Sequence, residues 1–147
     1  MMNTFGAQIG AFCDNNEVNV KAVVRKIAFE LFRKAILKTP VDTGRARANW
    51  GVAIGAPNIG SPTDAVDQSG TAALTSAAQG VQSWQGQGSI FMTNNLPYIG
   101  RLEYGGYPSP PKVATGKTAG GFSIQAPNGM VRISMDEIVT FLQQGMK

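Results

Sequence analysis

The sequence predicts an α+β fold with a long helix in its N-terminal half, a small antiparallel sheet, a C-terminal helix and a long loop rich in glycine and proline. Apolar residues recur at steps of three and four over residues 20–38 and again over 127–144, the period of a helix with one buried side. Two short apolar runs, at residues 50–56 and 89–93, predict strands. With 147 residues the chain has the length of one domain, so we expect residues 1–147 to fold as a single unit.

The first long helix has a recognisable beginning and end. Asn16 or Asn19 can cap it, because an asparagine side chain accepts hydrogen bonds from the free backbone N–H groups of a first helical turn. Pro40 ends it, since proline lacks an N–H group and disfavours helix at the preceding residue. Residues 1–16 predict either one or two helical turns or a terminal arm whose apolar side docks on a neighbour. That apolar side consists of Phe5, Ile9 and Phe12.

The middle of the chain alternates turns, strands and helix. Pro40 and Gly44 predict a turn before the first strand. Ser61 and Pro62 have the form of a helix start, and the alanine-rich residues 64–84 predict the helix itself. The second strand, at 89–93, leads into a short helix that carries Tyr98, Leu102 and Tyr104.

The C-terminal third combines a loose segment with a well-marked helix. Residues 105–123, the extended loop, hold eight glycines and prolines, and a loop of this length is usually functional or ordered by a neighbour. Pro127 is the predicted first residue of a helix that runs to Gln144. Its predicted buried side consists of Met130, Ile133, Ile138, Phe141 and Leu142.

Charge is sparse and unevenly placed. Charged residues make up 15% of the chain, below the roughly 25% of an average globular domain, which favours a subunit covered by neighbours over a fully solvated monomer. The net charge is +4, and basic residues concentrate in residues 21–47. This cluster is compatible with a solvated helix face, an acidic protein partner or DNA.

No set of residues points to catalysis, a metal or a cofactor. The chain has no histidine and one cysteine, Cys13, so it lacks the usual general base, the common metal ligands and any intrachain disulfide. Gly116-Lys117-Thr118 is similar to the end of a phosphate-binding loop, but the glycine needed earlier is replaced by Pro111, which has no N–H group. We therefore expect no enzyme activity and no cofactor. No apolar run is long enough to span a membrane, and the first ten residues lack the features of a secretory signal.

Three blocks of sequence form a recognisable set. The first is KTPVDTGRARANW, at residues 38–50, preceded by a helix. The second contains NNLPY and LEYG within residues 90–105, and the third is QAPNGMV at 125–131. In this order, and covering most of the chain from about residue 20, they resemble a family of small tail-component proteins of long-tailed bacteriophages.

The resemblance implies an α+β subunit that builds a ring, expected to be hexameric, at the phage neck or the head-proximal end of the tail. It also implies a place in the virion after assembly in the host cytoplasm. The implied partners are further copies of the chain and other neck and tail proteins, namely the head-tail connector, the tail terminator or the tail tube. Genomic DNA would pass through the lumen without specific binding. Neck, tail-completion and tail-terminator roles all fit the motif.

The motif is not catalytic, so its proline, glycine and aromatic residues are interpreted as maintaining the fold. Its charged residues Arg45, Arg47 and Glu103 are candidates for ion pairs within or between subunits. The other candidate interface residues are Phe5, Ile9, Phe12 and Tyr107.

A second class of function stays open at the level of sequence, namely a basic module that contacts DNA through residues 21–47. Tyrosines 98, 104 and 107, near Arg101, would then stack on bases, although a packed aromatic core is the more common role for such residues. The chain carries no recognisable DNA-binding motif, and a net charge of +4 is small. Tight DNA binding with a steep salt dependence is the property that distinguishes this class.

Overall fold

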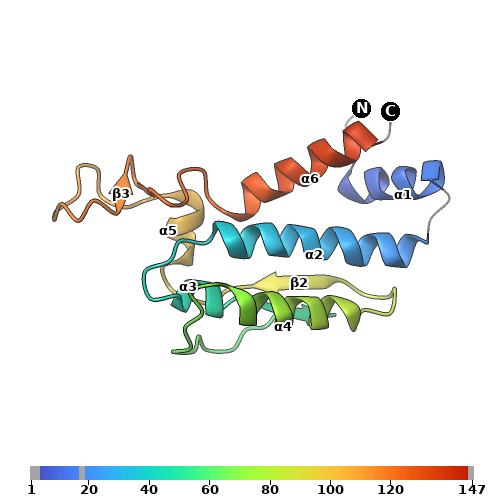
Figure 1. The fold of residues 1–147 in the computed structure, drawn as a ribbon, viewed down its shortest axis with the longest axis horizontal. Helices are drawn as coiled ribbons and strands as arrows, with labels where there is room; N and C mark the ends of the chain where they lie inside the picture. Colours follow the sequence, from blue (N-terminus) through green and yellow to red (C-terminus); the bar gives the residue numbers. More distant parts are fainter. Residues whose placement is uncertain (1–3, 17–18, 146–147) are drawn as a thin grey trace.

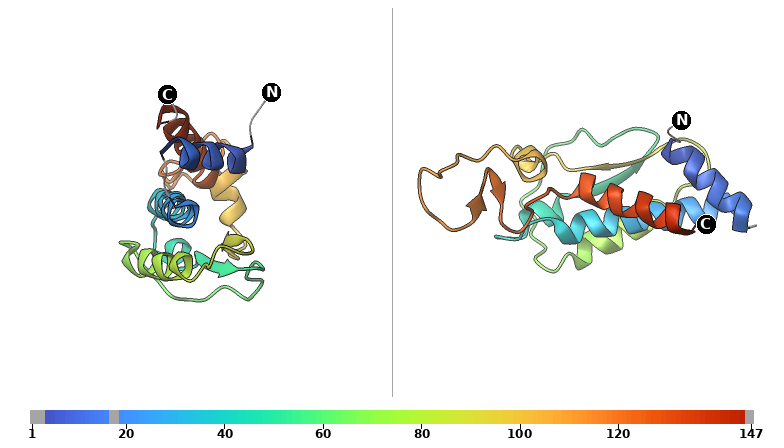
Figure 2. Two further views of the ribbon diagram at one scale, coloured as in Figure 1. Left: turned by 90° about the vertical axis from the view of Figure 1, so that its right-hand side faces the viewer. Right: turned by 90° about the horizontal axis from the view of Figure 1, so that it is seen from above.

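A computed structural model describes residues 4–16 and 19–145, and the main elements stack in three tiers (Figure 1). The upper tier holds α1 (Phe5–Asn16) and α6 (Val131–Gly145), and the middle tier is α2 (Val20–Lys38). The lower tier holds α4 (Thr71–Gln82) beside a two-stranded sheet, as the end view in Figure 2 also shows. The predicted α+β class, with its long helix, small sheet and C-terminal helix, is confirmed.

The sheet is antiparallel and short. In it β1 (Gly51–Ile54) pairs with β2 (Ile90–Thr93), with Val52 opposite Met92 and Ile54 opposite Ile90. One face packs on α4 so closely that a Cβ at Gly80 would lie 2.8 Å from the Cβ of Val52. Small residues on α4 therefore let helix and sheet approach each other.

Three shorter pieces connect these tiers. The turn after α2 contains one helical turn, α3 (Arg45–Ala48), and β2 leads into α5 (Ile99–Tyr104). The extended loop carries a small hairpin of its own, formed by β3 (Thr118–Ala119) and β4 (Phe122–Ser123). It projects from the body at the end opposite both chain termini (Figures 1 and 2).

The position of α2 explains why its sequence signal is strong. Asn19 caps the helix as expected, its side chain accepting a hydrogen bond from the Ala22 N–H at 3.2 Å, and the helix stops before Pro40. Because α2 lies between two tiers, it buries two sides. Ile27 packs with α1 and α6, whereas Phe32 and Ile36 pack with α4 and the sheet.

The segment before α2 is a helix of three turns, longer than the one or two turns expected. On α1, Ile9 is 8% exposed and packs against Ile27, Ile138 and Leu142 of its own chain. The side chains of Phe5 and Phe12 lie outside the part of the chain whose side chains the structure describes. Within residues 4–16 and 19–145, no helix is long and apolar enough to cross a membrane.

Two helix starts differ from the sequence prediction. The alanine-rich helix begins at Thr71 and not at Ser61-Pro62, because residues 58–67 run as an irregular loop. The last helix begins at Val131 and not at Pro127, because Gly129 has a φ of +83° that a right-handed helix cannot contain.

The buried side of α6 is also narrower than predicted. Ile138 and Leu142 are at most 4% exposed, as is Met130 just before the helix, but Phe141 is 60% exposed. This helix packs on α1 and α2 along one side only. Phe141 precedes Leu142 and projects from a different side of the helix, away from these contacts.

Candidate functional site

The turn after α2 is held together by the side chain of Arg47. Its guanidinium donates hydrogen bonds to three backbone carbonyl oxygens, those of Leu37 at 2.8 Å, Thr39 at 3.0 Å and Gln68 at 2.7 Å. Two of these carbonyls, those of Leu37 and of the C-cap residue Thr39, lie at the C-terminal end of α2, where cations suit the helix dipole. Arg47 thus joins the end of one helix to the loop that precedes α4.

Arg45 points toward a different loop. Its Nε donates to the Thr63 carbonyl at 2.9 Å, and its guanidinium forms an ion pair with Asp64 at 3.2 Å. The Asp64 side chain is 99% exposed, so this pair contributes little to stability. Asn49 makes the firmer link, since its side chain both accepts from the Thr63 N–H at 2.8 Å and donates to the Thr63 carbonyl at 3.1 Å.

The second sequence block also binds the loop that precedes α4, through Asn95. Asn95 donates to the carbonyls of Asn58 at 3.0 Å and Gly60 at 2.8 Å. Neither Asn49 nor Asn95 was among the candidate site residues, although both stand inside the blocks that resemble the family. The loop they fix presents Ile59, which at 92% is the most exposed large apolar side chain among the described residues.

Gly44 is required where the turn meets the start of α4. It has a φ of +94°, and a Cβ there would lie 2.7 Å from the Gln68 backbone nitrogen and 2.8 Å from the Asp67 backbone. This close approach places the Asp67 carboxylate at the helix, where it accepts from the N–H groups of Gly70 at 3.0 Å and Ala73 at 2.9 Å. Asp67 therefore satisfies the first turn of α4.

Glu103 has the corresponding role for α6. The residue is 7% exposed, and its carboxylate accepts from the N–H groups of Met130 at 2.7 Å, Val131 at 2.8 Å and Arg132 at 2.9 Å. Gly129 makes room for it, because a Cβ at that position would lie 2.5 Å from the Glu103 carbonyl oxygen. The predicted ion-pairing residue thus caps a helix that begins 28 residues later.

The environment of Glu103 favours its ionised form. Burial raises the pKa of the carboxyl, but the hydrogen bonds from the backbone N–H groups of Arg132, Val131 and Met130, together with that from the Arg132 side chain, outweigh burial and bring the pKa below its ordinary value. Arg132 also donates to the Glu103 carbonyl, and its guanidinium lies 4.6 Å from the centre of the Tyr104 ring.

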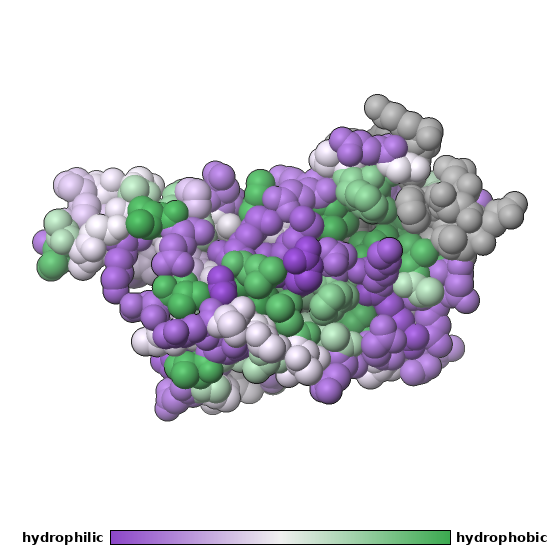
Figure 3. Space-filling model, in the orientation of Figure 1, coloured by the Kyte–Doolittle hydropathy of each residue, from purple (hydrophilic) through white to green (hydrophobic). Residues whose placement is uncertain are grey.

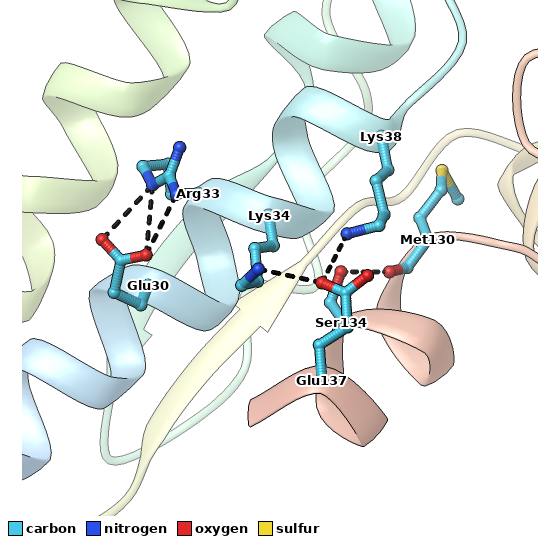
Figure 4. A network of polar contacts seen from close by, with 7 residues as sticks. All are labelled: Glu30, Arg33, Lys34, Lys38, Met130, Ser134 and Glu137. Atoms are coloured by element: carbon cyan, nitrogen blue, oxygen red, sulfur yellow. Dashed lines mark hydrogen bonds and ion pairs between the residues drawn. The ribbon is translucent and has the colours of Figure 1, made fainter. Parts of the chain in front are cut away.

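A second carboxylate joins the upper and middle tiers. Glu137 on α6 accepts hydrogen bonds from both Lys34 and Lys38 on α2, each at 2.9 Å, as Figure 4 shows. These hydrogen bonds lower the pKa of the Glu137 carboxyl. On α2, Arg33 pairs with Glu30 at 3.1 Å, and this ion pair also lies within the chain.

These contacts bear on the predicted basic surface. Arg25 donates to the Trp84 carbonyl, and Arg33, Lys34, Lys38, Arg45 and Arg47 all bind groups of their own chain. The basic segment 21–47 is therefore largely used in folding, and DNA would have to displace its internal partners. The face of the molecule drawn in Figure 3 carries separate apolar patches along the body and on the extended loop.

A cavity of about 710 Å³ lies between the turn after α2 and the extended loop. Tyr98, Leu102 and Tyr107 form part of its apolar lining, and Arg45 is also among the lining residues. The Tyr107 ring lies 5.8 Å from the guanidinium of Arg101. Of the candidate interface residues, Arg45 and Tyr107 thus line this cavity, whereas Arg47 and Glu103 are engaged in folding contacts and Ile9 packs in the upper tier.

The polar side chains of this region mainly fix loops and helix ends. Within residues 4–16 and 19–145, no group of three or more histidine, cysteine, aspartate or glutamate residues is placed to hold a metal ion. Many of the polar side chains described above bind backbone groups or cap helices, and these contacts fix the loops between the tiers.

Comparison with known proteins agrees with the first two sequence blocks, at residues 38–50 and 90–105, whereas the third, at 125–131, lies outside the matched residues. Residues 3–105 match the family model described as Bacteriophage HK97-gp10, putative tail-component. No curated protein and no solved structure is matched by the chain. Because the match covers well over half of the sequence and includes the turn after α2, the chain belongs to the HK97-gp10-like family of bacteriophage tail components.

Proposed function

We propose that this tail component is a non-enzymatic structural subunit that forms a ring, hexameric in our proposal, at the neck or the head-proximal end of the tail. In that position it would join tail to head during virion assembly. The observation that carries the proposal is the family match over residues 3–105, which makes the chain a component of the phage tail.

The distribution of polar contacts supports a structural role. Arg47, Asn49 and Asn95 hold loops in fixed positions, and Asp67 and Glu103 cap helices. Residues that fix backbone geometry are what a ring subunit needs, because each copy must present the same surface to its neighbours. An enzyme would instead keep part of such a network open toward a substrate.

The exposed apolar side chains support partners on several sides of the subunit. Ile59, Val113 and Phe141 are 92%, 72% and 60% exposed, and they lie on three different segments, a loop, the extended loop and α6. A ring subunit needs at least two different surfaces for its neighbours in the ring and others for the proteins above and below it. Our proposed partners are copies of the chain and the adjoining connector, terminator or tube proteins.

Electron microscopy of a lysate from a phage that lacks this gene tests the proposal. We expect full heads separated from tails, with restoration of joined virions when the gene is supplied in trans. Normal intact virions in the deletion lysate would contradict the proposal. In that case DNA binding measured against salt concentration becomes the next experiment, because a basic module would show affinity that falls steeply with salt.

A further inference from the structure

The extended loop has two parts that differ in how they are held. Its base is packed, since Gly121 and Ser123 are buried and the Gly121 carbonyl accepts from the N–H groups of Gly106 and Tyr107 at 2.9 and 3.0 Å. The distal segment, residues 108–117, is exposed at all ten positions. The loop is thus anchored at its base and open along its outer half.

One ion pair joins a described side chain of the distal segment to the body, and a backbone hydrogen bond of 3.0 Å from the Ile124 N–H to the Lys117 carbonyl ties the end of the segment to the base. Lys117 binds Asp42 in the turn after α2 at 3.0 Å, and the two side chains are 65% and 78% exposed. An ion pair this exposed holds a segment weakly. By contrast, Gln125 just beyond the base exchanges two hydrogen bonds of 3.0 Å with the backbone of Val41.

The distal segment also leaves a space between itself and the body. The 710 Å³ cavity is walled on one side by residues 40–46 and on the other by Pro108, Pro111 and Val113. Val113 remains 72% exposed above this space. The prolines restrict the backbone, so the segment loses less conformational entropy when it is seated on a partner.

We propose that in the assembled tail the distal segment of each copy seats on residues 40–46 of the adjacent copy, with Lys117 paired to Asp42 across the subunit boundary. The ion pair within one chain shows that Lys117 and Asp42 can bind each other, and an adjacent copy offers the same Asp42. Head-to-tail exchange also suits a segment that projects beyond the body at one end (Figure 2). This inference rests on the proposed assembly into a ring.

Cross-linking of mixed single variants tests the exchange. Two tagged genes, one with Asp42→Cys and one with Lys117→Cys, both in a Cys13→Ser background, complement the deletion phage together. Assembled tails are then treated with a short bismaleimide. A cross-linked dimer that contains both tags forms only if the loop of one chain lies on the turn of another. The matched control is the pair Lys34→Cys and Glu137→Cys, whose side chains meet at 2.9 Å within one chain, and it should give no mixed dimer.

The outcomes separate the inference from the proposed function. A mixed dimer for the Asp42 and Lys117 pair, absent from the control, supports exchange. The double variant Asp42→Cys/Lys117→Cys is treated in the same way. If copies assemble but the cross-link forms only within single chains of this double variant, exchange is overturned and the ring is unaffected. If the chain stays monomeric in tails and no mixed dimer forms, both are overturned.

Discussion

Replacing Glu103 by alanine should be among the most damaging single changes to this fold. The substitution leaves the N–H groups of Met130, Val131 and Arg132 without the carboxylate that now binds all three, at a position that is 7% exposed. Loss of a helix cap costs about 0.5–2 kcal/mol, and a favourable charge at a partly buried helix end adds up to about 2 kcal/mol. We therefore expect a loss of about 3 kcal/mol in the free energy of unfolding.

Urea unfolding of the wild type and of Glu103→Ala measures this loss directly. For a chain of this size about 3 kcal/mol corresponds to a melting temperature lower by about 6–12 °C. Glu103→Gln keeps one acceptor oxygen, so its loss should be about half as large. The matched control is Asp136→Asn, an exposed acid on the same helix, which should stay within about 0.5 kcal/mol of the wild type. Equal effects of Glu103→Ala and Asp136→Asn would refute the capping role.

The pH dependence gives an independent check on Glu103. Because its pKa in the folded state lies below the ordinary value of 4.5, the carboxylate stabilises the fold above that pH, and this contribution is lost as the pH falls through the folded-state pKa. The stability difference between the wild type and Glu103→Gln should thus be constant near neutrality and shrink in acid. A difference that grows below pH 4.5 would contradict the direction of the pKa shift.

Three further predictions concern packing and charge. Gly129→Ala should destabilise the fold by about 2 kcal/mol or more, because residue 129 has a positive φ and the added Cβ would lie 2.5 Å from the Glu103 carbonyl oxygen. The control is Gly100→Ala, whose added Cβ would have no atom within 4 Å and should not destabilise the fold. Urea unfolding midpoints measure both variants. Leu142→Ala should cost about 2–5 kcal/mol in the same assay and Phe141→Ala less than about 1, so similar losses would contradict the one-sided packing of α6. Glu137→Gln should cost less than about 1 kcal/mol, and the loss should fall at high salt, because its carboxylate pairs with lysines near the surface.

Local signals in the sequence predict most of the elements correctly. The helix from Val20 to Lys38 has its cap, its apolar period and its stop within one continuous segment, and all three are confirmed. The strand pair also follows from local pattern, and its register brings Val52 opposite Met92. These elements depend on neighbours in the sequence, so a single sequence is sufficient to find them.

The starts of α4 and α6 could not be placed, because their caps do not follow the usual local pattern. A proline at a first helical position suggested starts at Pro62 and Pro127, but Asp67 and Glu103 instead satisfy the N–H groups of the two helices. Glu103 acts from a distance of 28 residues, which no local pattern reveals.

The charged residues of the site illustrate the same difficulty. The sequence predicts Arg45, Arg47 and Glu103 as candidates for ion pairs within or between subunits. Within the chain, most of their partners are backbone groups of segments distant in sequence. The role of Asn49 and Asn95 in fixing residues 58–63 depends on how these loops pack together, which only the fold defines.

A reconstruction of the intact virion by electron cryomicroscopy would show directly where this subunit lies. We expect a closed ring of copies of this fold at the junction of head and tail, with the distal segment of each copy against residues 40–46 of the next. Density for the fold along the whole tail, or at its far tip, would contradict a role at the junction.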